Sequence, residues 1–257
     1  MKIESFPRKL FLFRNNLCMF AQTQNELHNM KHMSILAVSL LALVACTPEK
    51  KQEADYSQYV NPMIGTDFTG NTYPGAQVPF GMVQLSPDNG LPGWDRISGY
   101  FYPDTTIAGF SHTHLSGTGA GDLYDISFMP VTRPYKEAPA PLGIYSTFSH
   151  NDEAASAGYY RVLLKDYNIN VELTATERCG IQRYTFPEAE ASVFLNLKKA
   201  MNWDFTLDSK IEVVDSTTIR GYRLSQGWSP LQHVYFETRF SKPFVACHML
   251  SLIHISE

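Results

Sequence analysis

Residues 168–175 read NINVELTA, and polar and apolar side chains alternate at every position of this stretch. Because successive side chains of a β-strand point to opposite faces of a sheet, such alternation predicts a strand with one buried face. The same alternation is carried by two further sets of residues: Tyr160, Val162 and Leu164, and then Val234, Phe236, Thr238 and Phe240. This period of two indicates that sheets build the second half of the chain.

The intervening residues add strands and turns to this pattern. Val193, Leu195 and Leu197 share one face of an apolar run, and Asp215 begins a hairpin turn between β-branched stretches. No segment keeps a helical period over three turns, and short strands separated by turn signals are typical of a β-sandwich. The sequence therefore predicts an all-β fold, an antiparallel β-sandwich over residues 58–246.

Composition supports a folded domain and gives no sign of a nucleic-acid partner. The 257 residues are 44% hydrophobic and 18% charged, which is ordinary for a globular protein that buries a core. The formal net charge is −4, so the chain lacks the basic footprint typical of nucleic-acid binding. We therefore expect no nucleic-acid partner.

In residues 61–130, glycine and proline recur among aromatic, histidine and acidic residues. Glycine permits positive φ and the close approach of a ligand, and long ordered loops are usually functional. Aromatic rings in such loops suit stacking against an uncharged ligand such as a sugar. We therefore expect long, glycine-rich loops that build a site on the sandwich.

Trp94 and Asp95 follow a Pro-Gly turn, which leaves two interpretations of the indole open. The indole is either a sugar platform facing solvent or a plug between two sheets. Asp122 and Asp125 are the nearest pair of carboxylates; they either act as an acid–base pair on a glycosidic bond or cap backbone donors beside glycine. Residues 117–121 lack the lysine and the helix of a phosphate loop, which disfavours a nucleotide site.

His112 and His114 stand two residues apart and would share one face of an extended segment. Three roles remain open for them: hydrogen bonding to a substrate, a structural role in the loop, and zinc ligation together with Asp122. A third and fourth ligand at metal-site spacing are missing, so we assign no metal site. Ser111 and Ser116 lack the GxSxG motif, which disfavours a serine hydrolase.

The amino-terminal residues carry a targeting signal. Residues 30–45 hold a short basic region and the apolar run SILAVSLLALVA, which is too short for a membrane span, and Cys46 follows. Since LVAC resembles a bacterial lipobox, we expect residues 30–45 to be a lipoprotein signal peptide and Cys46 to be lipidated. Residues 46–57 are then a polar tether, and the protein is exported to the periplasm, outer membrane or cell surface.

Neither end of the chain fits this arrangement of signal peptide, tether and exported domain. We interpret residues 1–29 as a mis-assigned upstream start and residues 247–257 as a non-native tail. Of the remaining cysteines, Cys179 and Cys247 lie far apart with no spacing that demands a pair, so we expect free thiols.

Several motifs together resemble one family. The stretches VNPMIGT, TYPGAQVPFGMVQLSPD, GWDRISGY and GFSHTHLSGTGAGDLYDISFMP look like the amino-terminal region of glycoside hydrolase family 92, a family of bacterial exo-acting α-mannosidases. The resemblance continues through GYYRVLLKDYNINVELTATERCGIQRYTFP and covers residues 59–244. It implies a sandwich followed by an (α/α)6 barrel that this chain lacks. Where members often have tryptophan and cysteine, this chain has Arg96 and Ile97, which leaves the linkage preference open.

The resemblance also implies that the calcium ligands, the general acid and the general base lie in the missing helical domain. No catalytic or metal residue is therefore assigned here, and calcium is expected in the whole protein and not in this fragment. The sandwich would form one wall of a pocket for mannose-containing glycans. The expected substrate-binding residues are Trp94, Asp95, His112, His114 and Asp122.

The first hypothesis is the amino-terminal fragment of an exported, calcium-dependent, inverting exo-α-mannosidase that releases terminal mannose, the fragment alone being inactive. The alternative is a stand-alone carbohydrate-binding lipoprotein without catalysis. A metal hydrolase that uses His112 and His114 is the third hypothesis.

Overall fold

The computed structural model describes residues 54–137, 143–188, 190–198 and 203–248. The chain divides into two compact units, residues 1–54 and 55–257, and almost all described residues belong to the second. The expected upstream start, the signal peptide, the lipidation site Cys46 and the end of the tail lie outside the described residues.

Strands and three short 3-10 helices are the regular elements of the described residues, which contain no α-helix. The 3-10 helices are η1 (Ser57–Tyr59), η2 (Trp94–Arg96) and η3 (His150–Asp152). The strands are β1 (Ala76–Gln77), β2 (Gln84–Asp88), β3 (Thr106–Ile107), β4 (Gly109–Ser111), β5 (Ser127–Thr132), β6 (Ser146–Thr147), β7 (Glu153–Ser156), β8 (Tyr159–Leu164), β9 (Ile169–Ala175), β10 (Gly180–Thr185), β11 (Ala191–Asn196), β12 (Phe205–Val213), β13 (Thr218–Gln226) and β14 (Gln232–Arg239).

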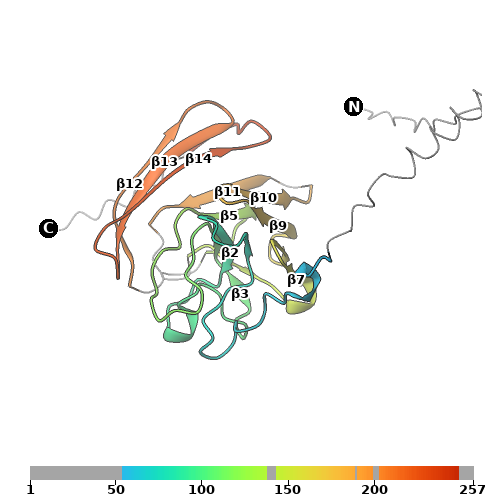
Figure 1. Cartoon of the computed structure of the whole chain (residues 1–257). Helices are drawn as coiled ribbons and strands as arrows, with labels where there is room; N and C mark the ends of the chain where they lie inside the picture. Colours follow the sequence, from blue (N-terminus) through green and yellow to red (C-terminus); the bar gives the residue numbers. More distant parts are fainter. Residues whose placement is uncertain (1–53, 138–142, 189, 199–202, 249–257) are drawn as a thin grey trace, which may run out of the picture. The chain divides into compact units, whose positions relative to one another are not determined.

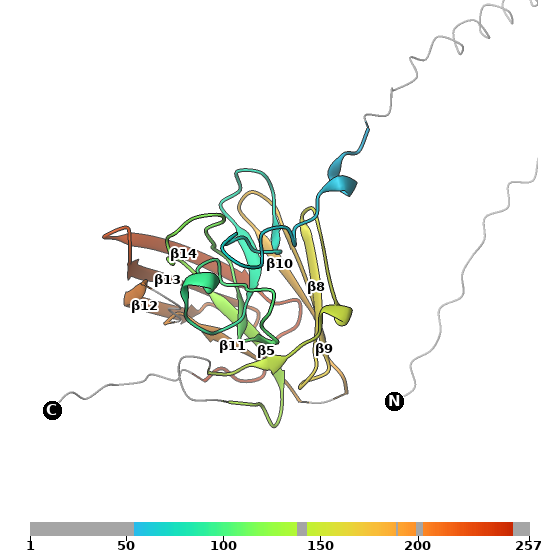
Figure 2. The ribbon, with the colours of Figure 1, turned by 90° about the horizontal axis from the view of Figure 1, so that it is seen from below.

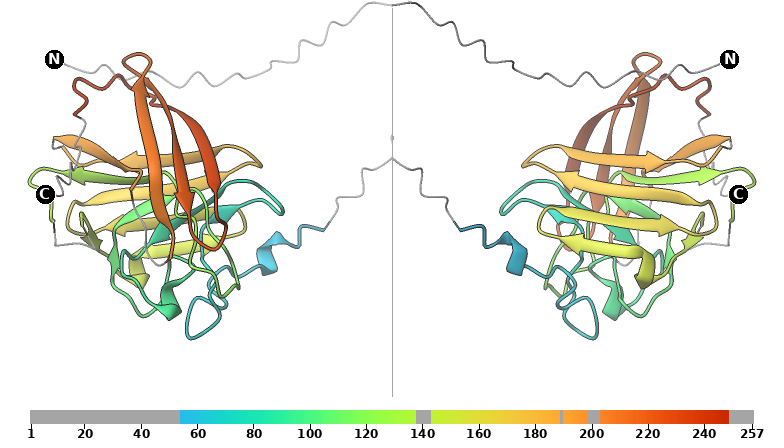
Figure 3. Two further views of the ribbon diagram at one scale, coloured as in Figure 1. Left: turned by 90° about the vertical axis from the view of Figure 1, so that its left-hand side faces the viewer. Right: turned by 90° about the vertical axis from the view of Figure 1, so that its right-hand side faces the viewer.

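The sheets form layers around a central five-stranded sheet with the order β1-β2-β4-β5-β11. The sheet β10-β9-β8-β7 packs on one face of this central sheet, and the sheet β12-β13-β14 packs on the other. Figures 1 and 2 show β5 and β11 between these two outer sheets. In Figure 3, the strands β12–β14 run across the strands of the layers behind them. The described strand pairs are antiparallel, which confirms the predicted antiparallel sandwich and adds a third layer to it.

The larger core lies between the central sheet and the sheet β7–β10. The alternation in residues 168–175 is confirmed, because Ile169, Val171 and Leu173 of β9 are buried and polar side chains occupy the other face. The corresponding residues of β8, Tyr160, Val162 and Leu164, are buried in the same cluster. The period of two in the sequence thus determines which face of this sheet is buried.

Strand β5 lies at the centre of the molecule and is buried along its whole length. Its residues Met129 and Val131 join the larger core, whereas Phe128 joins a second cluster on the opposite face. A strand covered on both faces needs apolar residues at consecutive positions, which explains why this segment does not alternate. The third layer therefore requires a strand with two apolar faces.

The sheet β12–β14 covers the second cluster with its inner face. Val234 and Phe236 of β14 pack there beside Ile211 of β12, as the alternation predicted. The hairpin turn is also confirmed, since Asp215 lies between β12 and β13 and its Oδ1 accepts a hydrogen bond from the Thr217 amide at 2.7 Å.

Two further features of the described residues bear on the sequence analysis. Cys179 and Cys247 are free and exposed, as expected. The described part of the chain contains no apolar helix of membrane-spanning length.

Candidate functional site

Trp94 lies on η2, directly after a glycine with φ 147°, and 57% of its surface is exposed. Its indole packs against Gly119, where an added Cβ would come within 3.3 Å of the ring. A second indole, Trp203, is 44% exposed, with its ring centroid 6.1 Å from that of Trp94 and the two planes tilted by 48°. The exposed interpretation of Trp94 therefore holds, and glycine at position 119 lets the loop approach the ring.

Arg96 fixes the short helix that carries Trp94. Its guanidinium donates to both carboxylate oxygens of Asp104, at 2.6 and 2.5 Å, and lies over the ring of Phe101. Two parallel hydrogen bonds hold a side chain in one orientation. The residue that departs from the usual family motif thus has an internal partner in this chain.

Asp122 is buried and holds the connection between β13 and β14. Its Oδ2 accepts hydrogen bonds from the amides of Trp228 and Ser229 at 2.6 and 3.3 Å, and from Gln232 Nε2 at 3.0 Å. Its other oxygen, Oδ1, is buried without a hydrogen-bond partner among the described residues. Of the roles considered for this carboxylate, its contacts with the Trp228 and Ser229 amides correspond to the capping of backbone donors.

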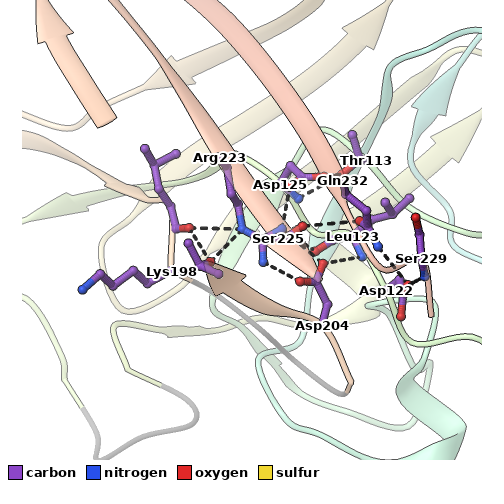
Figure 4. Close-up of polar contacts among 12 residues, drawn as sticks. Thr113, Asp122, Leu123, Asp125, Lys198, Asp204, Arg223, Ser225, Ser229 and Gln232 are labelled. Carbon is purple, nitrogen blue, oxygen red and sulfur yellow. Dashed lines mark hydrogen bonds and ion pairs between the residues drawn. The ribbon is translucent and has the colours of Figure 1, made fainter. Parts of the chain in front are cut away.

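A buried ionic network lies beside this loop (Figure 4). Arg223 of β13 is fully buried, and it donates to Asp125 Oδ1 at 2.6 Å and to Asp204 Oδ1 at 2.9 Å. Burial raises the pKa of Asp204 above its ordinary value, although Arg223 opposes the shift. The same guanidinium also donates to three neutral acceptors, namely Thr206 Oγ1 and the carbonyl oxygens of Leu123 and Leu197.

The network holds a strained segment in place. Leu123, Tyr124 and Ile126 have φ values of 84°, 63° and 57°, a region that residues other than glycine seldom adopt. Each such residue costs on the order of 1–3 kcal/mol unless the surroundings impose the conformation. The Leu123 amide donates to Asp204 Oδ2 at 2.9 Å, so a carboxylate 81 positions away fixes this backbone.

His112 is half-buried and neutral. Its Nδ1 lies 2.8 Å from the carbonyl oxygen of Ile126 and must donate to it, so Nε2 faces Gln182 Nε2 at 3.4 Å as an acceptor. Burial lowers the pKa of His112 to about 4. The ring therefore offers one donor and one acceptor, and both have partners within the protein.

We expect His112 to make the protein less stable in acid. Its pKa is about 4 in the folded state and about 6.5 in the unfolded chain, so between these values the unfolded chain binds the extra proton. The contribution of neutral His112 to stability is therefore present above about pH 6.5 and is lost as the pH falls towards 4. Urea unfolding of wild type and His112→Asn at both ends of this interval checks this. The stability difference between the two proteins should shrink in acid, and a constant difference contradicts the assignment.

His114 is buried and faces a different set of partners. Its Nδ1 donates to the carbonyl oxygen of Gln84 at 2.7 Å, and Nε2 lies 2.9 Å from Asp88 Oδ1 and 3.1 Å from Ser111 Oγ. Gly99 borders this group with φ 89°, and a Cβ there would lie 2.7 Å from Asp88 Oδ1. The second glycine of the motif GWDRISGY, Gly99, is thus required both by its backbone conformation and by this close approach.

The two histidines therefore do not act together. No group of three or more histidine, cysteine, aspartate or glutamate side chains among the described residues could hold a metal ion. His114, Asp122 and Asp125 have internal partners and are buried, while Trp94 is exposed and Asp95 is half-buried. The substrate-binding roles of Trp94, Asp95, His112, His114 and Asp122 stay predictions, and exposure favours Trp94 and Asp95.

Sequence reasoning missed Trp203, Asp204 and Arg223. One signal was present, because Trp203-Asp204 repeats the Trp94-Asp95 dipeptide. Nothing local to Arg223 distinguishes it from the arginines of β10 and β13 that pair at the surface, such as Arg183.

Comparison with known proteins agrees with the fold and the motifs. Residues 59–253 match the N-terminal domain of glycosyl hydrolase family 92. The family 92 α-mannosidase BT3965 from Bacteroides thetaiotaomicron is 43% identical, with a TM-score of 0.70, over 74% of this chain and 26% of that one. The inverting mannosidase BT2199 from the same species is 28% identical, with a TM-score of 0.60, over 76% and 26% of the two chains. An uncharacterised secreted glycosidase of Arthroderma benhamiae is 26% identical over 63% of this chain and 21% of its own length.

These similarities define the chain as a β-sandwich domain of the glycosidase class. The chain belongs to glycosyl hydrolase family 92, and residues 59–253 correspond to the N-terminal domain of that family. It spans about a quarter of the length of the solved family members, 26% in each of the two described above.

Proposed function

We propose that this chain is the amino-terminal part of an exported exo-α-mannosidase that releases terminal mannose from glycans. The observation that carries the proposal is the 43% identity with an α-mannosidase, extending over 74% of this chain. The exposed indole of Trp94 on an ordered loop supports a contact with the glycan, because the apolar face of a sugar ring stacks on such rings.

The proposed reaction is hydrolysis with inversion at the anomeric carbon. One carboxylic acid protonates the leaving oxygen while a carboxylate about 6.5–9.5 Å away activates water on the opposite face. Asp122 and Asp125 do not suit these roles, since both are buried and Asp125 is paired with Arg223. We therefore assign the acid and the base to the region that the family members have beyond this domain. To this chain we assign the binding of the sugar on the leaving-group side of the cleaved bond.

Calcium is proposed for the same further region. Calcium takes six to eight oxygen ligands, typically from several carboxylates. The described residues have no cluster of three or more suitable side chains, so they do not fit such a site. The sandwich would thus contribute binding surface to a pocket whose metal ligands come from elsewhere.

Export through a lipid anchor at Cys46 completes the proposal. The support is the lipobox-like LVAC after an apolar run, together with the secreted relative. Labelled palmitate should be incorporated into the wild-type protein in cells, and Cys46→Ser should abolish the incorporation.

Mannosidase assays with the whole protein test the proposed function. The whole protein should hydrolyse α-linked mannobioses and release mannose first as the inverted anomer, whereas residues 46–246 alone should show no turnover. Trp94→Ala should reduce kcat/KM by up to about tenfold, because a stacking contact contributes about 0.5–1.5 kcal/mol. Trp94→Phe should restore part of the loss. Turnover by the fragment, or its absence from the whole protein, would contradict the proposal.

A stand-alone sugar-binding protein is the second candidate, and the exposed pair Trp94 and Trp203 favours it. It requires that residues 46–246 alone bind mannose saturably and that Trp94→Ala lose the binding. Calorimetric titration of this domain with mannose distinguishes the two candidates when it is combined with the activity of the whole protein.

A further inference from the structure

All three tryptophans of the chain lie next to one loop, residues 117–122, although they are far apart in the sequence. Trp94 packs on Gly119, the Trp203 amide lies 3.5 Å from the Gly121 carbonyl oxygen, and the Trp228 amide donates to Asp122. All three side chains are exposed, by 57%, 44% and 79%. Because large apolar side chains are otherwise buried, the exposed pair of Trp94 and Trp203 indicates a binding surface, whereas Trp228 lies apart from this pair.

Of the other two indoles, only that of Trp203 contacts the Trp94 ring. The rings of Trp94 and Trp203 are 6.1 Å apart, whereas Trp228 makes no ring contact among the described residues. The ring planes are tilted by 48° and both side chains are exposed, so the two indoles do not form one continuous plane. Two sugar units that turn relative to each other along a glycan can each place an apolar face on one of these planes.

The position of Trp203 is fixed from inside the protein. The next residue, Asp204, is buried and receives hydrogen bonds from Arg223 and from the Leu123 amide. Leu123 directly follows the loop that packs against Trp94. The Asp204 carboxylate therefore anchors both the segment that carries Trp203 and the loop beside Trp94. Anchoring of the residue next to Trp203 reduces the conformational entropy that this segment loses when a ligand binds.

The surroundings of the pair suit a neutral polar ligand. Thr118 is exposed on the same loop, Ser116 is exposed just before it, and Asp95 is half-buried next to Trp94 in the sequence. Hydroxyl and carboxylate groups beside aromatic rings can bind sugar hydroxyls, while the rings bind the apolar face.

We propose that Trp203, together with Trp94, binds a second sugar unit of the glycan, one unit further from the cleaved bond than the sugar that Trp94 contacts. This inference rests on the proposed function and makes the enzyme selective for chains longer than a disaccharide. Trp203 acts on binding and has no part in bond cleavage.

Kinetics of the whole protein on α-mannobiose and α-mannotriose test the proposal. Trp203→Ala should raise KM for the trisaccharide about tenfold more than KM for the disaccharide, a difference of about 1.4 kcal/mol. Trp203→Phe should restore most of the effect, because it keeps an aromatic face. Trp228→Ala is the matched control, an exposed tryptophan at the same loop, and it should leave the ratio of the two KM values as in wild type.

The outcomes separate this inference from the proposed function. Equal changes in KM for both substrates, or a change in kcat alone, overturn the role of Trp203 while leaving the mannosidase in place. If the whole protein hydrolyses no mannoside, the proposed function fails, and titration of its tryptophan fluorescence with mannotriose then tests the binding. Saturable quenching that Trp203→Ala abolishes and Trp228→Ala retains supports the second-sugar contact, and its absence from wild type overturns it.

Discussion

Replacing Arg223 by methionine is expected to lower the free energy of unfolding by about 3–5 kcal/mol, the largest loss we predict for a single residue. The guanidinium is fully buried and pairs with two carboxylates, Asp125 and Asp204. Methionine fills a similar volume but leaves both carboxylates without this cation in a region that water does not reach. The folded state then becomes less stable, because the two carboxylates must become protonated or the strained loop must open to water.

Urea unfolding of residues 46–257 measures this loss, with Arg220→Met as the control. Arg220 lies three residues earlier on β13 and pairs with Glu212 at the surface, where both side chains are about half exposed. Such a pair contributes roughly 0–1 kcal/mol, so the control should change stability little. Equal effects of the two substitutions would show that the buried network does not stabilise the fold. Since Asp204 also supports Trp203, the Arg223 variant should weaken trisaccharide binding as well.

Replacing His114 by leucine is expected to cost about 3 kcal/mol of stability, the second largest effect. The Gln84 carbonyl can only accept, so Nδ1 of His114 donates to it, and Nε2 lies 2.9 Å from Asp88 Oδ1. Leucine removes both contacts, so the Gln84 carbonyl and the buried carboxylate of Asp88 lose their shared partner. The melting temperature and urea midpoint should both fall.

A double-mutant cycle separates this pair from packing. His114→Leu and Asp88→Asn should each destabilise, and the double variant should cost less than the sum of the two, by at least about 1 kcal/mol. Additive effects would mean that the two side chains stabilise the fold independently. Tyr73, which contacts the His114 ring at 5.0 Å, offers a control, because Tyr73→Phe keeps this ring contact.

The positions of the predicted site residues in the structure show what the sequence alone does not predict. His112 and His114 were grouped because they are two residues apart, yet one contacts Ile126 and Gln182 and the other contacts Gln84 and Asp88. Spacing fixes the direction of a side chain only while the backbone stays regular, and β4 ends at Ser111, before both histidines. Trp94 and Asp95 stay together because both lie on η2, which Arg96 anchors to Asp104, and their role in binding stays a prediction.

The sequence alone determined the strands of the second half, such as β8, β9 and β14, together with their buried faces and the family, because the period of two and the motifs of residues 61–130 are local properties of the chain. The short strands β1 to β4 within residues 61–130, which the sequence indicated only as loops, were not predicted. Only the tertiary structure decided that β5 has two covered faces, that Arg223 is buried between Asp125 and Asp204, and that Trp203 lies beside Trp94. The physical reason is that these contacts join residues roughly 20 to 110 positions apart, and a buried charge or a ring pair depends on which segments the folded layers bring together.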